Sequence, residues 1–249
     1  MLQVRDGNDP LLKRPFSLFR TIAGGIQLLY RIQGKGTTLI SQLAAGDVVS
    51  LLGPLGNAYP VQGAASAASV SPPVIIAGGV GIASVFPLIE SIHEVMHQST
   101  RDTMNGGATV IYGARTAEEL LDLDELKALS KELHVCTDDG SSGEKGNVLD
   151  LLKSIVPAEA GVLPVMYACG PKPMLRAVAE YAGSLGAKTY LSMEEHMACG
   201  IGACLGCVVK TKSKGQDVDD SADIEKSTEW KYQRVCMEGP VFNAEDIVW

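Results

Sequence analysis

The sequence lacks the features that place a protein in a membrane or outside the cell. It contains no run of about 18 apolar residues, the length that a membrane-spanning helix requires. Its first residues contain no apolar core of a secretory signal. Positive charge is scarce, since 21 lysine and arginine residues face 29 acidic ones and the net charge is −8. This balance argues against binding to nucleic acid or to anionic membranes, and we expect a cytoplasmic protein.

Internal repeats and strong compositional bias are also missing. The hydrophobic fraction of 46% and the charged fraction of 20% are ordinary for a folded protein. The length of 249 residues allows two domains, or one large domain with a small appendage. Composition therefore indicates a globular protein, and its function must be inferred from motifs.

Four of the six cysteines have a distinctive spacing. Cys199, Cys204 and Cys207 form a C-x4-C-x2-C run, and Cys236 follows further along the chain. This is the plant-type ferredoxin spacing, which suits a [2Fe–2S] cluster with two thiolates on each iron. A loop around an anionic cluster needs a backbone that can adopt positive φ and direct N–H groups at sulfur. Three glycines lie between the ligands: Gly200, Gly202 and Gly206.

Three other kinds of cysteine site fit this pattern less well. A structural zinc site usually takes paired C-x2-C knuckles, and only one such pair occurs here. A disulfide framework needs an oxidising compartment, which nothing in the sequence indicates. Burial as an unreactive residue is the expected role of Cys136 and an alternative for Cys169, because neither has ligand spacing. The four spaced cysteines are therefore predicted to bind one [2Fe–2S] cluster.

The first quarter of the chain favours short strands. Apolar runs at residues 26–32 and 47–52 lie between glycine turns. Between them, a glycine turn leads into a short helix over residues 34–43, with Thr37 or Thr38 as its cap. Residues after position 60 are small, polar and end in two prolines, a composition typical of a linker.

The middle of the chain alternates apolar strands with helices. The expected strands cover residues 74–77, 108–112, 133–136, 164–168 and 188–191. The expected helices cover residues 82–96, 116–133, 147–155 and 173–185. Buried strands that alternate with helices predict a doubly wound parallel sheet. The remaining residues hold the cysteine motif and a charged insert, 210–231, which we expect to form a solvated loop or hairpin.

Two glycine-containing turns follow strands of the expected sheet. Gly78–Gly81 lies between a strand and a helix, where glycines let the backbone approach a pyrophosphate or a ribose. Packing of the helix on the sheet would explain the same glycines. Cys169–Met174 occupies the equivalent place after a later strand, at the carboxyl edge where open α/β sheets bind ligands. The sequence therefore indicates a nucleotide site at this edge.

Two further motifs near the N-terminus suit a phosphate-containing cofactor. The segment Arg14–Ser17 offers a guanidinium group for a pyrophosphate and a hydroxyl for the edge of a flavin. A strand start with a surface arginine is the structural alternative. The segment Gly34–Thr38 adds a helix N-terminus, which also suits phosphate.

Short motifs occur in a fixed order along nearly the whole chain, and together they carry a resemblance. The set resembles the electron-transfer subunits of dihydroorotate dehydrogenase B, within the ferredoxin-NADP reductase superfamily. The motifs are, in order, Arg14-Pro-Phe-Ser17, Tyr30-Arg-Ile32, Gly34-Lys-Gly-Thr37, Leu52-Gly-Pro-Leu-Gly-Asn57, Ala77-Gly-Gly-Val-Gly81, Thr137-Asp-Asp-Gly-Ser141, Cys169-Gly-Pro-Lys-Pro-Met174, Leu191-Ser-Met-Glu-Glu-His-Met-Ala-Cys-Gly-Ile-Gly-Ala-Cys204 and Cys236-Met-Glu-Gly-Pro-Val-Phe242.

The resemblance implies three domains with three cofactors. They are a flavin-binding β-barrel in residues 1–65, an α/β nucleotide domain in residues 73–192 and a small [2Fe–2S] domain in residues 193–249. The residues implied to line FAD are Arg14, Pro15, Phe16, Ser17, Tyr30, Arg31, Ile32, Gly36, Thr37 and Thr38. Those implied to border NAD are Gly78, Gly79, Gly81, Cys169, Gly170, Pro171 and Met174.

The resemblance also implies the activity and the partner. Dihydroorotate would be oxidised at FMN in a separate catalytic subunit, in pyrimidine biosynthesis. Electrons would pass through the cluster and FAD of this chain to NAD⁺, because a flavin exchanges both single electrons and pairs. The sequence contains no general acid or base constellation for orotate chemistry. We therefore expect an oxidoreductase subunit that works in a hetero-oligomer, without nucleic acid or membrane.

Two features depart from the family pattern. The Arg-Pro-Phe-Ser motif begins at position 14, so we expect the first barrel strands to be missing and FAD binding to depend on them. The insert 210–231 lengthens the gap before the fourth cysteine. Arg115 would suit a 2′-phosphate of NADP, although Glu118 and Glu119 lie close by.

Two other functions remain open. The first is a differently partnered NAD(P)H–ferredoxin-type reductase, including the flavin subunit of a bifurcating complex. The second is a non-enzymatic iron–sulfur protein, which the short barrel makes plausible. A flavin absorption spectrum would separate the second alternative from the reductase functions.

Overall fold

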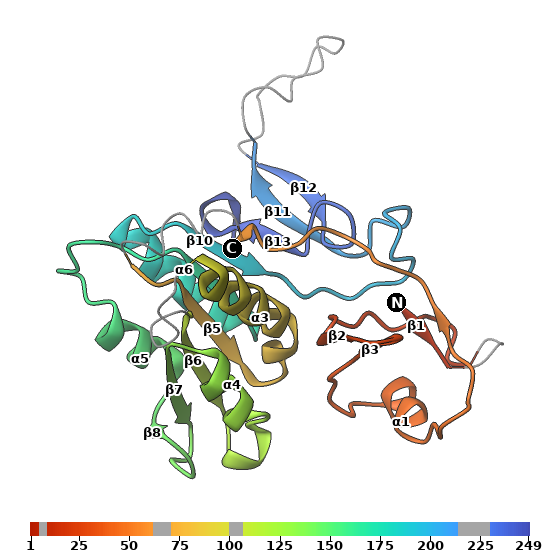
Figure 1. The fold of residues 1–249 in the computed structure, drawn as a ribbon. Helices are drawn as coiled ribbons and strands as arrows, with labels where there is room; N and C mark the ends of the chain where they lie inside the picture. Colours follow the sequence, from red (N-terminus) through yellow and green to blue (C-terminus); the bar gives the residue numbers. More distant parts are fainter. Residues whose placement is uncertain (5–8, 62–70, 100–106, 214–229) are drawn as a thin grey trace, which may run out of the picture.

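A sheet of seven strands forms the centre of the molecule (Figure 1). The fold is that of a computed structural model, which describes residues 1–4, 9–61, 71–99, 107–213 and 230–249. In spatial order the strands are β13 (Val241–Asn243), β10 (Thr189–Ser192), β9 (Met166–Cys169), β5 (Val74–Gly78), β6 (Thr109–Ala114), β7 (Glu132–Thr137) and β8 (Glu144–Lys145). All neighbours are parallel except β10 and β13. The predicted parallel sheet is confirmed.

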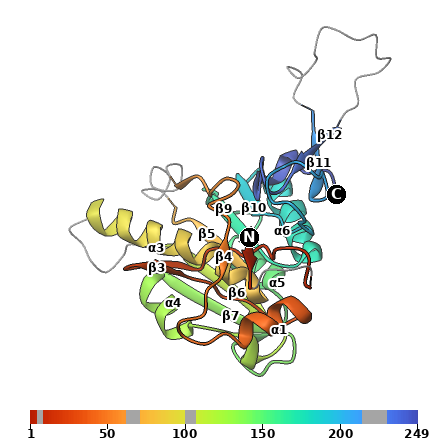
Figure 2. The ribbon, with the colours of Figure 1, turned by 90° about the vertical axis from the view of Figure 1, so that its right-hand side faces the viewer.

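Helices cover both faces of this sheet, as Figure 2 shows. They are α3 (Ile82–Ser99) and α4 (Leu123–Leu129) on one face, and α5 (Val148–Ile155) and α6 (Lys172–Leu185) on the other. Ile75 and Val110 lie in the core under α3 and α4, whereas Ile76 and Ile111 lie under α5 and α6. Because both faces are covered, the strands are continuous apolar runs. This arrangement is doubly wound, as the sequence predicted.

Helix α3 is the central helix of its face. Its residues Val85, Phe86 and Ile89 are fully buried against the sheet. Within the described part of the chain, Gly79–His97 is the one helical segment whose length and composition would allow it to cross a membrane. Its apolar side lies on β5 and β9, which is the usual place of a core helix.

Two predicted helix ends are confirmed by their caps. The side chain of Asn147 accepts hydrogen bonds from the amides of Leu149 and Asp150, at 2.9 and 3.2 Å, and so begins α5. Gly186 ends α6 with φ of 73°, a left-handed conformation that glycine adopts without strain.

The helix predicted over residues 116–133 is wrong. Residues Ala117–Glu119 form a single 3₁₀ turn, α4 covers only Leu123–Leu129, and β7 already begins at Glu132. Asp122 has φ of 54°, which interrupts a continuous helix. Thr116 makes no side-chain cap, and the Glu119 side chain pairs with Arg31 and Arg115.

The N-terminal part is built from short elements. They are β1 (Leu2–Gln3), β2 (Arg20–Ile22), β3 (Gly25–Gln27), α1 (Lys35–Ser41) and β4 (Ser50–Leu51). Strand β1 pairs with β4 and β2 pairs with β3, so residues 1–4 and 9–61 form two small sheets and no closed barrel. The strand predicted over residues 26–32 is therefore confined to its first residues.

The predicted caps of α1 are also wrong. Gly34 occupies the cap position without a side-chain hydrogen bond. Thr37 and Thr38 lie inside the helix, and both hydroxyls donate to the Gly34 carbonyl at 3.1 Å. Glycine takes the cap because φ there is 106°, which threonine would adopt only with strain.

The C-terminal part combines a hairpin with an addition to the central sheet. Strands β11 (Val208–Lys212) and β12 (Trp230–Arg234) pair antiparallel at the ends of the predicted insert, whose residues 214–229 lie outside the described residues. After the hairpin, β13 joins the edge of the central sheet beside β10. The hairpin of β11 and β12 lies above the central sheet in the view of Figure 1.

Candidate functional site

The loop between β10 and β11 is shaped around the thiol of Cys199. The amides of Ile201, Cys204 and Ala203 point at this sulfur, and they lower the pKa of the Cys199 thiol to about 6. The Cys204 amide lies 3.4 Å from the sulfur. Gly200 and Gly202 have positive φ, as predicted, whereas Gly206 does not and its neighbour Leu205 does, with φ of 55°. The loop therefore favours a thiolate at Cys199 before any metal is considered.

The fourth cysteine is placed next to the third by a tight turn. Cys236 lies in residues 234–239, where the Arg234 carbonyl accepts hydrogen bonds from three amides. The Val235 amide donates to the Cys207 carbonyl at 2.8 Å. The Arg234 side chain pairs with Glu238 and donates to the Gly202 carbonyl at 3.0 Å. Arg234, which the sequence analysis missed, thus joins the two ligand segments.

The four thiols form two pairs of different exposure. Cys207 and Cys236 are buried, Cys199 is half-buried and Cys204 is exposed. Cys199 interacts with the Cys204 thiol, and Cys236 interacts most strongly with the Cys207 thiol and also with Cys199. Among the described residues, no three histidine, cysteine or acidic side chains surround one point as a single metal ion requires. Paired thiols in a loop rich in amides fit a [2Fe–2S] cluster, which takes two thiolates on each iron.

The two turns at the carboxyl edge of the sheet are packed against each other. A Cβ added at Gly78 would lie 2.5 Å from the Met174 sulfur, and one at Gly81 would lie 2.4 Å from the Cys169 carbonyl oxygen. A Cβ at Gly170 would clash with Met174 in the same way. The packing explanation therefore accounts for these three glycines.

Gly79 differs from its neighbours. Its φ is 54° and the atom nearest to an added Cβ is the Arg31 guanidinium, at 3.7 Å. Pro171 packs against Gly78 from the other turn. The structure thus brings all the residues predicted for NAD to one edge, together with Arg31, which was predicted for FAD.

A group of polar side chains around the buried Cys169 and Ser192 lies beneath this edge. The Cys169 thiol is 3.9 Å from Glu194 Oε1, and the Ser84 and Ser192 hydroxyls are 3.1 Å apart beside it. Burial raises the pKa of Cys169 to about 12 and also raises the pKa of Glu194. Tyr59 closes the group with its hydroxyl 3.5 Å from the Ala168 carbonyl. Cys169 is therefore a buried thiol, as expected from its lack of ligand spacing.

The residues predicted for FAD are brought together only in part. Arg14 lies directly over Gly36, where an added Cβ would clash with the guanidinium. Both line a small pocket with Leu2 and Ile40. The rings of Phe16 and Tyr30 meet edge to face, with centroids 5.5 Å apart. The other predicted residues lie on the outside of this part: Pro15, Ser17 and Ile32 are exposed, and Thr37 and Thr38 bond to Gly34.

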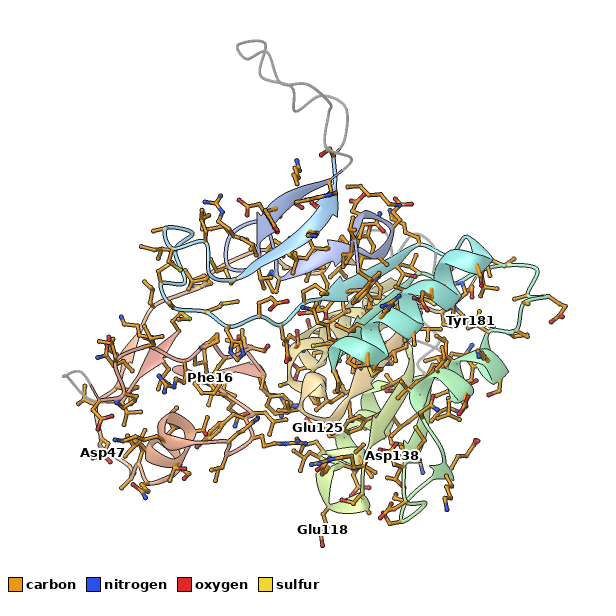
Figure 3. The ribbon with its side chains drawn as sticks, turned by 180° about the vertical axis from the view of Figure 1, so that it is seen from behind. Phe16, Asp47, Glu118, Glu125, Asp138 and Tyr181 are labelled. Atoms are coloured by element: carbon orange, nitrogen blue, oxygen red, sulfur yellow. The ribbon has the colours of Figure 1, made fainter. Side chains whose placement is uncertain are left out.

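Arg20 fixes the N-terminal part to the nucleotide domain. Its Nε donates to Glu90 Oε1 at 2.8 Å, and its Nη2 lies 2.7 Å from Glu125 Oε1. The guanidinium also stacks over the ring of Phe86, 4.6 Å from the centroid. In Figure 3, Glu125 lies at the boundary between the two parts, on the side of the nucleotide domain.

Asn57 connects the N-terminal part to the C-terminal part. Its amide nitrogen donates to the carbonyls of Glu238 and Val241, at 2.9 and 2.8 Å, and its oxygen accepts from the Val241 amide at 2.9 Å. The backbone amide of Asn57 donates to the Gly239 carbonyl at 2.6 Å. The sequence predicted neither contact, although Asn57 ends one of the family motifs, because the partners of Arg20 and Asn57 lie far away in the chain.

Comparison with known protein families gives two domain matches. Residues 75–180 match the oxidoreductase NAD-binding domain. Residues 194–248 match the iron–sulfur cluster binding domain of dihydroorotate dehydrogenase B. The second match covers all four paired cysteines.

Solved structures share the fold. A chain of an NADH-dependent reduced ferredoxin-NADP oxidoreductase, studied for flavin-based electron bifurcation, is similar with a TM-score of 0.69 and 26% identity, over 96% of this chain and 75% of that chain. The ferredoxin reductase of carbazole 1,9a-dioxygenase is similar with a TM-score of 0.50 and 15% identity, over 71% and 53% of the two chains. The latter similarity concerns the fold alone.

Characterised relatives match along nearly the whole chain. The dihydroorotate dehydrogenase B (NAD(+)) electron transfer subunit of Bacillus caldolyticus is 36% identical over 99% of this chain and 84% of its own length. The subunit of the same name from Fusobacterium nucleatum is 33% identical over the same shares. The chain therefore belongs to the family of dihydroorotate dehydrogenase B electron transfer subunits.

Proposed function

We propose that this chain transfers electrons between an FMN-containing dihydroorotate dehydrogenase subunit and NAD⁺, in the cytoplasm. The observation that carries the proposal is the pairing of four thiols in a chain of this family that also matches an NAD-binding domain. A flavin would supply exchange of single electrons and pairs, and a [2Fe–2S] cluster would supply exchange of single electrons. The domains would be residues 1–65 for FAD, 73–192 for NAD and 193–249 for the cluster.

Particular side chains would hold each cofactor. The thiols of Cys199, Cys204, Cys207 and Cys236 would ligate the cluster. Arg14 would bind a phosphate of FAD from its position over α1, supported by the remaining residues of the Arg-Pro-Phe-Ser and Tyr-Arg-Ile motifs. The NAD site would lie along the packed turns Gly78–Gly81 and Cys169–Met174, with Gly79 facing the nucleotide.

The exposure of the cluster loop supports a partner surface there. Ile201 and Leu205 are 56% and 62% exposed, and Cys204 between them is exposed as well. Met237 adds a further apolar side chain, 47% exposed, from the turn that holds the fourth cysteine. By contrast, Met197 packs against the core. Apolar side chains around an exposed ligand suit an interface through which electrons leave the chain.

A second candidate is a flavin subunit of a bifurcating NADH-dependent ferredoxin-NADP reductase. The similarity to that enzyme's chain, at 26% identity, favours it. The two functions differ in partner and in electron acceptor. A dihydroorotate-dependent reaction therefore separates them.

The test is co-purification with an FMN-containing dihydroorotate dehydrogenase subunit under anaerobic conditions. We expect dihydroorotate to reduce NAD⁺ only when both chains are present. Cys204→Ser should remove the visible cluster absorption and the reduced-state paramagnetic signal, and with them this activity. Cys136→Ser is the matched control, because Cys136 is a buried thiol distant from the other cysteines in sequence. Full activity of Cys204→Ser, or no activity of the wild-type pair, would contradict the proposal.

A further inference from the structure

Glu119 joins two arginines at the carboxyl edge of the sheet. Its Oε2 lies 3.2 Å from Arg31 Nη2 and 3.3 Å from Arg115 Nε. The second carboxylate oxygen, Oε1, accepts from Arg115 Nη2, so Arg115 is held by both oxygens. Arg115 lowers the pKa of Glu119, which is therefore ionised at neutral pH. The single carboxylate of Glu119 thus forms ion pairs with both Arg31 and Arg115.

The position of Arg115 relates it to a bound dinucleotide. Arg115 is the first residue after β6, and β6 is hydrogen-bonded to β5, whose end carries Gly79. In dinucleotide-binding sheets the pyrophosphate lies at the turn after the first strand, and the adenosine ribose lies beyond the end of the next strand. There an acidic residue accepts from the ribose hydroxyls in NAD proteins, whereas an arginine accommodates the 2′-phosphate in NADP proteins. Here both residue types occur side by side.

The surroundings of Glu119 hold it in place. It ends the 3₁₀ turn Ala117–Glu119, and the Ala117 amide donates to the Ser141 hydroxyl at 2.7 Å. The Asp139 amide donates to the Arg115 carbonyl at 3.3 Å. The side chain of Asp138, on the same loop, adds negative potential at Arg115. Figure 3 shows Asp138 and Glu118 at this end of the nucleotide domain, with Glu118 directed away from the molecule.

We propose that Glu119 makes the site selective for NAD over NADP, because it engages the guanidinium of Arg115 that would otherwise bind a 2′-phosphate. The proposal rests on the proposed NAD function and assigns its specificity to one ion pair. A 2′-phosphate carries about −1.5 to −2 charges near neutral pH. The Glu119 carboxylate would therefore repel it, and Arg115 would not be free to bind it because Arg115 is paired with Glu119. A ribose 2′-hydroxyl has no charge and can donate to the same carboxylate.

The test measures nucleotide binding and needs neither flavin nor cluster activity. The probes are adenosine 5′-monophosphate and adenosine 2′,5′-bisphosphate, titrated calorimetrically into the purified chain. We expect Glu119→Gln to raise the affinity for the bisphosphate about tenfold relative to the monophosphate, the effect of one freed charged hydrogen-bond donor. Glu118→Gln is the matched control, because this neighbouring side chain points to solvent, and it should leave the ratio unchanged.

A second variant identifies the arginine responsible. In the double variant Glu119→Gln with Arg115→Ala, the gain should disappear. An unchanged ratio in Glu119→Gln, or a gain that persists without Arg115, would overturn the proposal while monophosphate binding still upheld the NAD site. Absence of binding of both nucleotides to all variants would overturn the NAD site itself. Thermal unfolding of each variant checks that the domain remains folded.

Discussion

The connection that Asn57 makes between the N-terminal and C-terminal parts can be tested by Asn57→Ala. This substitution removes three side-chain hydrogen bonds to the backbone of residues 238–241, the segment that follows Cys236. Each hydrogen bond contributes roughly 0.5–1.5 kcal/mol, and because Asn57 is exposed we take about 0.7 kcal/mol for each bond, which gives about 2 kcal/mol for the three. Val241 is buried at 7% exposure, so its amide would lose its partner without gaining full hydration.

The expected result is local opening of this connection. A loss of about 2 kcal/mol raises the equilibrium constant for opening roughly 30-fold. Hydrogen exchange measured by mass spectrometry should therefore accelerate about 30-fold at the amides of Val241 and of residue 57, whereas amides of β5 keep their protection. Asn57→Asp is less suitable as a test because it adds a charge.

Asn243→Ala serves as the matched control. Among the described residues, the Asn243 side chain hydrogen-bonds only to the nearby Glu245, with distances of 2.8 and 3.4 Å. We expect its loss to leave exchange at residue 57 unchanged. If Asn57→Ala exchanges at the wild-type rate at both amides, the three hydrogen bonds do not hold the two parts together and the reasoning is refuted.

Three further predictions concern the cofactor, the partner and the domain contact. Arg14→Ala should weaken FAD binding about tenfold or more in a fluorescence titration, because a charge-assisted contact to phosphate is lost. Lys13→Ala is the control, and equal FAD affinity of the two variants would show that Arg14 does not bind FAD. Ile201→Glu should weaken the complex with the dehydrogenase subunit, because the new charge would be desolvated at the interface, while the cluster spectrum stays normal. The control Ile22→Glu, at an exposed position of β2, should bind the subunit as the wild type does, and a tight complex of Ile201→Glu would show that this loop is not the interface. Arg20→Met should lower the unfolding temperature by a few degrees, because the ion pairs with Glu90 and Glu125 are lost while packing on Phe86 is kept. An unchanged unfolding temperature would show that these two ion pairs add no stability.

Local patterns in the sequence predicted the nucleotide domain well. The apolar run Val74–Gly78, the helical spacing of α3 and the caps Asn147 and Gly186 all produced the expected elements. These features depend on residues close together in the chain, where period and capping chemistry decide the structure. The same reasoning failed at residues 116–133, where Asp122 has a left-handed conformation and Glu119 pairs with Arg31 and Arg115 instead of closing a capping box.

The N-terminal part shows a different limit of the sequence. Its strands are two or three residues long, and several of its large apolar side chains are exposed, among them Leu11, Ile32 and Val48. Such short strands obtain their stability from neighbours across a sheet rather than from their own pattern. The longer strands predicted from apolar runs were therefore not found there.

The sequence by itself determined the cysteine spacing, the order of motifs and the alternation of strands and helices, since each is written in neighbouring residues. Only the tertiary structure decided that Gly78 and Gly81 pack against the turn after β9, that β13 joins the central sheet, and that Arg31 meets Arg115 through Glu119. The physical reason is that these contacts join segments far apart in the chain. A polar side chain with several possible partners takes the one that folding of the apolar core brings within reach.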